Sequence, residues 1–219
     1  MRAGYYGWHA ANNGYILIAW TNAEANMAAW GATDPRLGNN PFVLAVPYTD
    51  KAIVLDFAMT QFSYGKMELY SLEDKQLPYP GGFDMKGRLT TDPGEILQSW
   101  RALPIGYWKG AGLALLLDIM ATILSGGRST ADITFDKKEK GAEFGVSQVF
   151  IAINPAKLNN SSRIRQAVDD IIDNLHHSVP EEGGSTIRYP GENVLNVRKR
   201  NQKNGIPVNP KIWDAILSM

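Results

Sequence analysis

A lysine flanked by glycines stands directly before the longest apolar segment of this 219-residue chain. Lys109 lies within the stretch 104–112, and the apolar segment continues to Leu124. A helix that begins here presents backbone N–H groups and the positive end of its dipole beside a cationic side chain. This combination binds anions, and a phosphate-bearing cofactor is the ligand that we expect. The same glycines also suit a simple turn and close helix packing, so both interpretations stay open.

The segment does not match the dinucleotide-binding fingerprint of the Rossmann fold. Leu115 stands where the third glycine of G-x-G-x-x-G would be, counted from Gly110. Pro104 and Gly106 precede it, where a strand should lead into the turn. A nicotinamide cofactor would therefore be bound without a standard Rossmann loop.

Candidates for acid–base or metal chemistry are few. The chain has no cysteine and three histidines. His9 is a weak candidate that can face a cleft, whereas His176 and His177 end an amphipathic helix, where we expect exposure and a favourable helix dipole. No HExxH motif, nucleophile elbow or paired metal-ligand spacing is present, so we predict no metal site. Asp56 and Asp118 lie inside apolar runs, either as structural caps or as ligands of cofactor hydroxyl groups.

Charge and composition argue against several classes of partner. Lys and Arg total 22, as do Asp and Glu, so the overall field favours neither nucleic acid nor an anionic membrane. The basic run 198–200 is typical of a solvated helix face. The apolar run 111–124 is shorter than the roughly 20 residues of a membrane span, and we expect a core helix. The lack of cysteine and of a signal peptide favours the cytoplasm.

Hydrophobic patterning predicts a layered α/β fold in which helices cover a sheet. Four continuous apolar runs are typical of strands covered on both faces. They are residues 15–20, 42–46, 52–57 and 146–153. Residues 76–93 indicate a long loop or hairpin, and residues 137–141 a charged turn.

Two amphipathic helices are predicted to cover the sheet. The first is capped by Ser161 or Ser162, and the second is capped by Asn209 with Pro210 at its first position. Their apolar stripes are Ile164, Val168, Ile171, Ile172 and Leu175 in the first, and Ile212, Trp213, Ile216 and Leu217 in the second.

Six short motifs are spread over the chain. They are RAGYYGW at 2–8, WGA at 30–32, RLGNNP at 36–41, FSYG at 62–65, LPIGYWKG at 103–110 and RYPGE at 188–192. In this order they resemble the malate/L-lactate/sulfolactate dehydrogenase family. The resemblance implies NADH-dependent reduction of a 2-oxo acid or diketo sugar acid. It also implies a homodimer with a non-Rossmann α/β fold, a layered mixed sheet covered by helices.

The resemblance assigns NAD contacts to three segments. They are Ala52, Ile53, Val54, Leu55, Asp56, Phe57 and Ala58; Trp108 and Lys109; and Gly191, Glu192 and Asn193. The second segment agrees with the anion-site argument. In the third, this chain has Glu-Asn where the family pattern has His-Glu. Pro190 fixes the approach of that turn.

The family's general acid has no counterpart in this chain. In the family the proton comes from a histidine in a Ser-His-Gly motif, and an Asn-His-Trp motif precedes the Met-Arg with which this chain begins. Both motifs are absent. We therefore expect residues 1–219 to be the cofactor-binding part of a reductase whose N-terminal catalytic segment is absent, and we assign no catalytic residue. The alternatives are a malate/L-lactate-type dehydrogenase, an NAD-binding fragment without chemistry, and a structural protein without cofactor.

Overall fold

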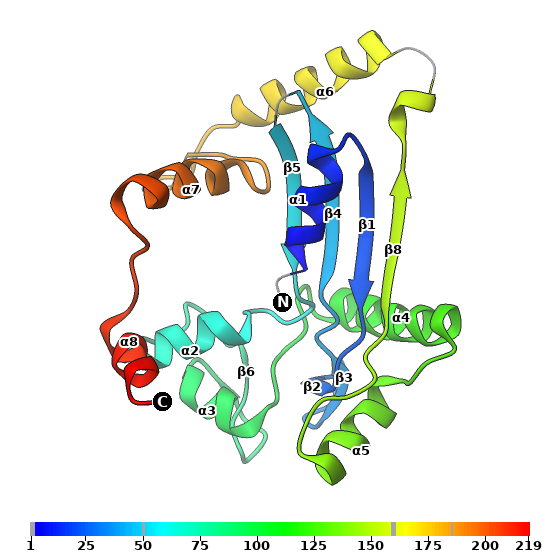
Figure 1. Cartoon of the computed structure of the whole chain (residues 1–219). Coiled ribbons are helices and arrows are strands. Elements are labelled where there is room, and N and C mark those ends of the chain that lie inside the picture. The colour runs from blue at the N-terminus through cyan, green and yellow to red at the C-terminus, as the bar shows by residue number, and fades with distance from the viewer. Residues whose placement is uncertain (1–2, 50, 159–160, 185) are drawn as a thin grey trace. The chain divides into compact units, whose positions relative to one another are not determined.

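A computed structural model describes residues 3–49, 51–158, 161–184 and 186–219, without the side chains of residues 161 and 162. The described chain mixes helices and strands, so the predicted α/β class is confirmed (Figure 1). The elements in chain order are α1 (Gly4–Asn12), β1 (Ile16–Thr21), β2 (Ala25–Ala28), β3 (Pro35–Gly38), β4 (Phe42–Tyr48), β5 (Lys51–Phe57), α2 (Tyr64–Leu72), β6 (Gly82–Phe83), β7 (Leu89–Thr90), α3 (Pro93–Ser99), α4 (Trp108–Ser125), α5 (Thr130–Lys140), β8 (Gln148–Ile153), the 3-10 turn η1 (Pro155–Lys157), α6 (Ser161–His176), α7 (Glu192–Asn204) and α8 (Pro210–Leu217).

The main sheet has the strand order β5-β4-β1-β8, and β2-β3 and β6-β7 form two-stranded antiparallel pairs. The chain divides into two compact units. Unit 1 consists mainly of Ile18–Val43 and Asp56–Ile151, and unit 2 of Gly4–Leu17, Leu44–Leu55 and Ala152–Met219. Each strand of the main sheet therefore has residues in both units.

The core of unit 1 forms where one face of α4 packs on strand residues. Ala114, Leu117 and Ala121 recur at helical spacing and are buried with Trp20 and Met27. The indole N–H of Trp20 donates to the Leu117 carbonyl at 3.1 Å, so this buried polar group is satisfied. A second cluster of unit 1 comprises Phe62, Met67, Leu77, Ile96 and Ala102.

The opposite face of α4 is exposed. Leu116 is 55% and Ile123 72% exposed, so the prediction of a core helix is correct for one stripe and wrong for the other face. Nearly every position from 111 to 124 is apolar, and periodicity therefore could not indicate which face is covered. Among the described residues, α4 is long and apolar enough to cross a bilayer, judged by length and composition alone. Core helices of soluble proteins can have the same length and composition.

Other apolar faces are exposed as well. The prediction that the four apolar runs are covered on both faces is wrong for residues 146–153, since Phe150 and Ile151 of β8 are 47% and 43% exposed. The other three runs also have an exposed member: Tyr15, Leu44 and Leu55. On α6, Ile172 is buried but Ile171 is exposed. The stripe of α8, which the sequence predicts to pack on the body, is exposed at all four positions. Periodicity identifies an apolar face but not what covers it.

The predictions of turns and helix caps are more accurate than those of burial. Residues 76–93 contain the β6–β7 hairpin, as expected. Asn209 caps α8 by accepting the N–H of Lys211 at 2.9 Å. The prediction of a charged turn at 137–141 is wrong for residues 137–140, which form the last turn of α5. Gly141 is the left-handed C-cap of this helix. The predicted caps of α6, Ser161 and Ser162, lie outside the described side chains.

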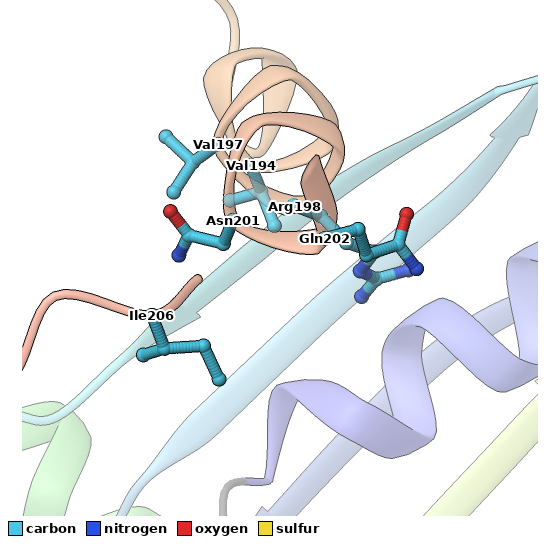
Figure 2. Close-up of a pocket in the computed structure, with 6 residues that line it drawn as sticks. All are labelled: Val194, Val197, Arg198, Asn201, Gln202 and Ile206. Atoms are coloured by element: carbon cyan, nitrogen blue, oxygen red, sulfur yellow. The ribbon is translucent and has the colours of Figure 1, made fainter. Parts of the chain in front are cut away.

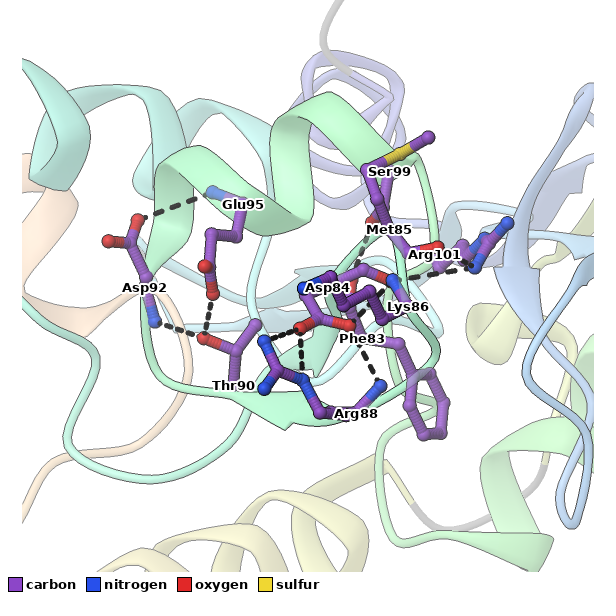
Figure 3. Close-up of polar contacts among 10 residues, drawn as sticks. All are labelled: Phe83, Asp84, Met85, Lys86, Arg88, Thr90, Asp92, Glu95, Ser99 and Arg101. Carbon is purple, nitrogen blue, oxygen red and sulfur yellow. Dashed lines mark hydrogen bonds and ion pairs between the residues drawn. The ribbon is translucent and has the colours of Figure 1, made fainter.

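The carboxylate of Asp84 closes the β6–β7 hairpin (Figure 3). It accepts the backbone N–H groups of Lys86 and Arg88, each at 2.8 Å, and the Nε of Arg88 at 2.7 Å. These bonds, led by the backbone N–H of Arg88, hold the pKa of Asp84 below its usual value. Nearby, Asp92 caps α3 by accepting the N–H of Gly94 at 2.8 Å.

We expect Asp84→Asn to remove part of the acid sensitivity of the fold. Because the pKa of Asp84 is lower in the folded than in the unfolded chain, its carboxylate stabilises the fold above about pH 4. This contribution is lost as the pH falls through the folded-state pKa. Urea unfolding at pH 7 and at about pH 3 should therefore show a smaller acid loss for Asp84→Asn than for the wild type. Asp74→Asn is the control, and equal acid losses in all three proteins would contradict this role.

Candidate cofactor site

In unit 1, the chain that follows β5 pairs with the segment that leads into α4. The N–H of Ile105 donates to the Met59 carbonyl at 2.7 Å, and the N–H of Gln61 donates to the Leu103 carbonyl at 2.8 Å. Met59 directly follows the first predicted cofactor segment, and Ile105 stands three residues before the second. Backbone pairing therefore joins the chain just after the first segment to the turn just before the second.

The N-terminus of α4 is an exposed helix start with a cation. Trp108 is 63% exposed, and Lys109 is exposed beside it. The turn before it has positive φ at Gly106 (58°) and Tyr107 (59°), and Tyr107 caps the helix without a side-chain hydrogen bond. Such a start leaves the positive end of the helix dipole uncompensated by a capping side chain.

Backbone donors at this start are partly used. The N–H of Lys109 donates to the Gly106 carbonyl at 3.3 Å, and that of Ala111 to the Tyr107 carbonyl at 3.1 Å. An anion here would therefore depend more on the Lys109 charge and the helix dipole than on backbone N–H groups. The sequence predicts free backbone donors at this helix start, and the structure shows two of them already bonded.

The glycines around Lys109 have separate structural roles. Gly106 adopts a positive φ that the turn requires. A Cβ on Gly110 would collide with the backbone carbonyl of Ile105, whereas one on Gly112 would meet nothing within 4 Å. The packing interpretation therefore applies to Gly110 and the turn interpretation to Gly106. Neither excludes an anion at Lys109.

Asn39 and Asn40, for which the sequence indicates no role beyond the motif at 36–41, join these parts of unit 1. The Asn39 carbonyl accepts the N–H of Met59 at 2.7 Å, and the side-chain amide of Asn40 donates to the Ala114 carbonyl of α4 at 2.8 Å. Asn40 is fully buried and has a φ of 29°. The Asn-Asn-Pro sequence is a turn signal, but it does not reveal which carbonyl the buried amide would reach.

In unit 2, β5 contacts the third predicted cofactor segment. The N–H of Val54 donates to the Pro190 carbonyl at 3.1 Å. Gly191 has a φ of 86°, and a Cβ there would lie 3.1 Å from the Val54 carbonyl oxygen and 3.2 Å from Trp8. Only glycine fits this approach without strain. Glu192 opens α7, and Asn193 is exposed in its first turn.

The two candidate carboxylates have different surroundings. Asp118 accepts the side-chain amide of Asn22 at 3.0 Å and the N–H of Thr130 at 3.0 Å. These bonds satisfy the start of α5, which supports the structural alternative for Asp118. Asp56 lies exposed near the end of β5, within the first predicted cofactor segment.

The histidines lie at surfaces. His9 is exposed in the last turn of α1. The predicted exposure of His176 and His177 is confirmed. The ring of His177 contacts the Asp173 carbonyl at 2.6 Å, whereas that of His176 contacts Glu192 at 3.2 Å, a pairing with no sequence signal. Among the described residues, no cluster of three His, Asp or Glu side chains could hold a metal ion.

A groove runs along one face of α7 (Figure 2). It is lined by Val194, Val197, Arg198, Asn201, Gln202 and Ile206. In Figure 2, Arg198 and Gln202 project together on one side, and Ile206 comes from the chain that follows the helix. The lining contains none of the predicted cofactor residues, so we do not assign it to the cofactor.

Comparison with known proteins decides the family. The sequence pattern of the malate/L-lactate dehydrogenase family matches residues 1–217. The chain belongs to the malate/L-lactate dehydrogenase family. Members of this family are NAD(P)-dependent dehydrogenases and reductases that act on 2-hydroxy acids.

Curated members of the family are similar over the whole chain. A 2,3-diketo-L-gulonate reductase from Klebsiella oxytoca is 43% identical over 219 residues, and one from Escherichia coli (strain K12 / DH10B) is 42% identical. Each match covers 100% of this chain and 65% of the relative. The chain therefore spans about two thirds of the length of these relatives.

Solved structures of family members share the fold. A malate dehydrogenase from Entamoeba histolytica has a TM-score of 0.89 at 26% identity, covering 99% of this chain and 63% of that chain. A sulfolactate dehydrogenase from Methanocaldococcus jannaschii has a TM-score of 0.80 at 30% identity, covering 97% of this chain and 60% of that chain. The recognised family and its α/β fold thus agree with the sequence-based prediction.

Proposed function

We propose that residues 1–219 form the cofactor-binding part of an NADH-dependent reductase that reduces the keto group of a 2-oxo acid or sugar acid. The proposed substrate is 2,3-diketo-L-gulonate, reduced to 3-keto-L-gulonate, because relatives of that name are 42–43% identical over the whole chain. The proposed catalytic segment precedes these residues in the complete reductase. A cytoplasmic location, favoured by the absence of cysteine, belongs to the same proposal.

The observation that carries the proposal is the backbone pairing around β5. Its residue Val54 bonds to Pro190, and Met59 just beyond its end bonds to Ile105. Within unit 2 the first predicted segment is thus bonded beside the third, and within unit 1 the chain just after the first segment is bonded to the turn that leads into the second. Lys109 would pair with a phosphate, and Asp56 or Glu192 would accept a ribose hydroxyl. Bound NADH would supply the hydride for the keto carbon.

We assign no general acid to this chain. His9 is exposed on α1, and the other two histidines contact α6 or α7 groups. Loss of a positioned acid typically lowers the rate by about 10²- to 10⁴-fold. This favours a second candidate, in which the chain on its own binds NADH without turning it over.

Titration of the purified chain with NADH tests the proposal. We expect saturable binding, which is measured as energy transfer from tryptophan to the nicotinamide. The energy-transfer signal should be weaker in Trp108→Phe. NADH oxidation with 2,3-diketo-L-gulonate then separates an active reductase from a binding fragment. A folded chain that shows no saturation would contradict the proposed function, and saturation without oxidation would favour the second candidate.

We further propose that a second copy of the chain covers the exposed face of α4. Its apolar side chains are too many for an isolated surface helix. They include Leu113, Leu115, Leu116, Ile119, Met120, Ile123 and Leu124, each at least 38% exposed. A twofold interface would place the same face of both copies in contact.

Leu116→Lys should therefore weaken self-association. Each copy would lose the burial of one leucine, about 1.5–3 kcal/mol, so the dimer dissociation constant should rise on the order of 10²-fold or more. Analytical ultracentrifugation measures this, with Leu89→Lys, an exposed leucine of β7, as the matched control. A monomeric wild type would contradict the proposal, and binding of the wild type to lipid vesicles would indicate a membrane as the occupant instead.

A further inference from the structure

The turn before α7 is closed by reciprocal contacts between Tyr189 and Glu192. The N–H of Tyr189 donates to Oε2 of Glu192 at 3.1 Å, and the N–H of Glu192 donates to the Tyr189 carbonyl at 3.2 Å. Gly191 is the N-cap residue of α7, but glycine has no side chain that could accept a helix N–H. The Glu192 carboxylate therefore determines the shape of the turn, since it bonds to the turn's first residue.

His176 contacts both ends of this turn from α6. Its Nε2 lies 3.2 Å from Oε2 of Glu192, the same oxygen that accepts the Tyr189 N–H. Its ring centroid lies 6.0 Å from that of Tyr189, at an interplanar angle of 39°. Tyr189 is buried, and on another side its ring meets Tyr48 of β4 at 6.0 Å, edge to face. His176 thus contacts a carboxylate 16 positions away and lies against a ring 13 positions away in sequence.

The middle of the turn lies against β5. Pro190 accepts the Val54 N–H at 3.1 Å, and the tight approach of Gly191 to Val54 leaves no room for a side chain. In the strand order, β5 stands at the edge of the main sheet. The Pro190 carbonyl therefore accepts a backbone N–H of this edge strand that would otherwise be open to a further strand. Loss of the Glu192 carboxylate would remove this acceptor of the Tyr189 N–H, one residue before the Pro190 carbonyl that binds Val54.

We propose that His176 is a positioning residue, which acts through Glu192 to hold the turn 189–191 on β5. The significance of this turn for NADH rests on the proposed function, but the positioning of the turn by His176 does not. Where NADH binds, His176 sets the position of Gly191 and Glu192 without touching the cofactor. His176 has no role in the family resemblance, and the contact spans two helices.

Amide hydrogen exchange of Val54 tests, without any cofactor, whether His176 keeps the turn 189–191 on β5. Since the Val54 N–H bonds to Pro190, its exchange reports how long the turn stays on β5. We expect His176→Ala to accelerate this exchange about two- to fivefold, the range for loss of one exposed side-chain hydrogen bond. Other amides of β1 and β4 should keep their rates. His176→Gln, which retains a side-chain N–H donor, should restore most of the protection, whereas a merely space-filling role would not depend on the donor.

A double-mutant cycle tests whether His176 acts through Glu192. In the Glu192→Ala background, His176→Ala should add little to the exchange rate of Val54. His177→Ala is the matched control, because its ring contacts the Asp173 carbonyl instead of the turn. Unchanged exchange in His176→Ala, or full additivity of the two changes, would overturn the proposal.

The NADH titration separates this inference from the proposed function. If the wild type binds NADH, His176→Ala should weaken binding two- to fivefold and His176→Gln should restore it. If the wild type binds no NADH, the proposed function fails, and Val54 exchange still decides whether His176 holds the turn. Faster Val54 exchange with unchanged NADH affinity would show that the turn does not contact the cofactor.

Discussion

Lys109→Ala should weaken NADH binding by about 10- to 100-fold. A charge-assisted hydrogen bond between an ammonium and a phosphate contributes about 1.5–3 kcal/mol, and two of the nearby backbone donors are already bonded, so little else can replace it. The fluorescence titration with NADH measures the change. Because the Lys109 side chain is exposed, its loss should leave the free energy of unfolding within about 0.5 kcal/mol.

Two variants control this result. Lys109→Arg keeps the charge and should retain most of the affinity. Lys138→Ala removes an exposed lysine from α5, a helix that carries no predicted cofactor residue, and should bind NADH like the wild type. Unchanged affinity in Lys109→Ala, while the wild type binds, would mean that the glycines and lysine of this segment serve only the turn and packing.

The sequence predicts the parts of the candidate site better than their connections. The helix start at Lys109 follows from local signals: glycines, a cation and an apolar run. The bonds from Val54 to Pro190 and from Met59 to Ile105 join residues far apart in the chain, and no periodicity encodes them. The resemblance names the segments, and backbone bonds join the first to the neighbour of the third within unit 2 and the chain after the first to the turn before the second within unit 1.

Side chains that act across elements are the least predictable. The amide of Asn40 reaches α4, and His176 reaches Glu192 from a neighbouring helix. In the sequence, His176 suggests only a helix end, because its partner is 16 positions away and on another element. The same limit applies to Asp118, for which the sequence leaves two roles open and the bonds to Asn22 and Thr130 favour one.

The exposed stripes show a different limit. Hydrophobic spacing identifies α4, α6 and α8 as amphipathic or apolar helices, and the structure agrees on where they run. Burial, however, depends on what lies opposite, and this is not a local property of the chain. Caps and turns are local, which is why Asn209 and the hairpin within 76–93 are predicted correctly.

Gly110→Ala and Gly112→Ala should have opposite effects on stability, although they stand two residues apart in α4. A Cβ on Gly110 would collide with the backbone carbonyl of Ile105, and backbone cannot swing aside as a side chain can. We expect a loss of about 1–3 kcal/mol or more in the free energy of unfolding. Gly112 is exposed with nothing within 4 Å of its Cβ position, so alanine should add up to about 1 kcal/mol through helix propensity.

Urea unfolding of the two variants measures both signs, and NADH titration connects them to the candidate site. To relieve the collision in Gly110→Ala, the segment 103–105 must shift, and this segment pairs with the chain that follows β5. Gly110→Ala should therefore also lose NADH affinity, whereas Gly112→Ala should keep it. Equal changes in the two variants would mean that helix propensity, and not the contact with Ile105, governs this helix start, and the connection between β5 and Lys109 would lose its physical basis.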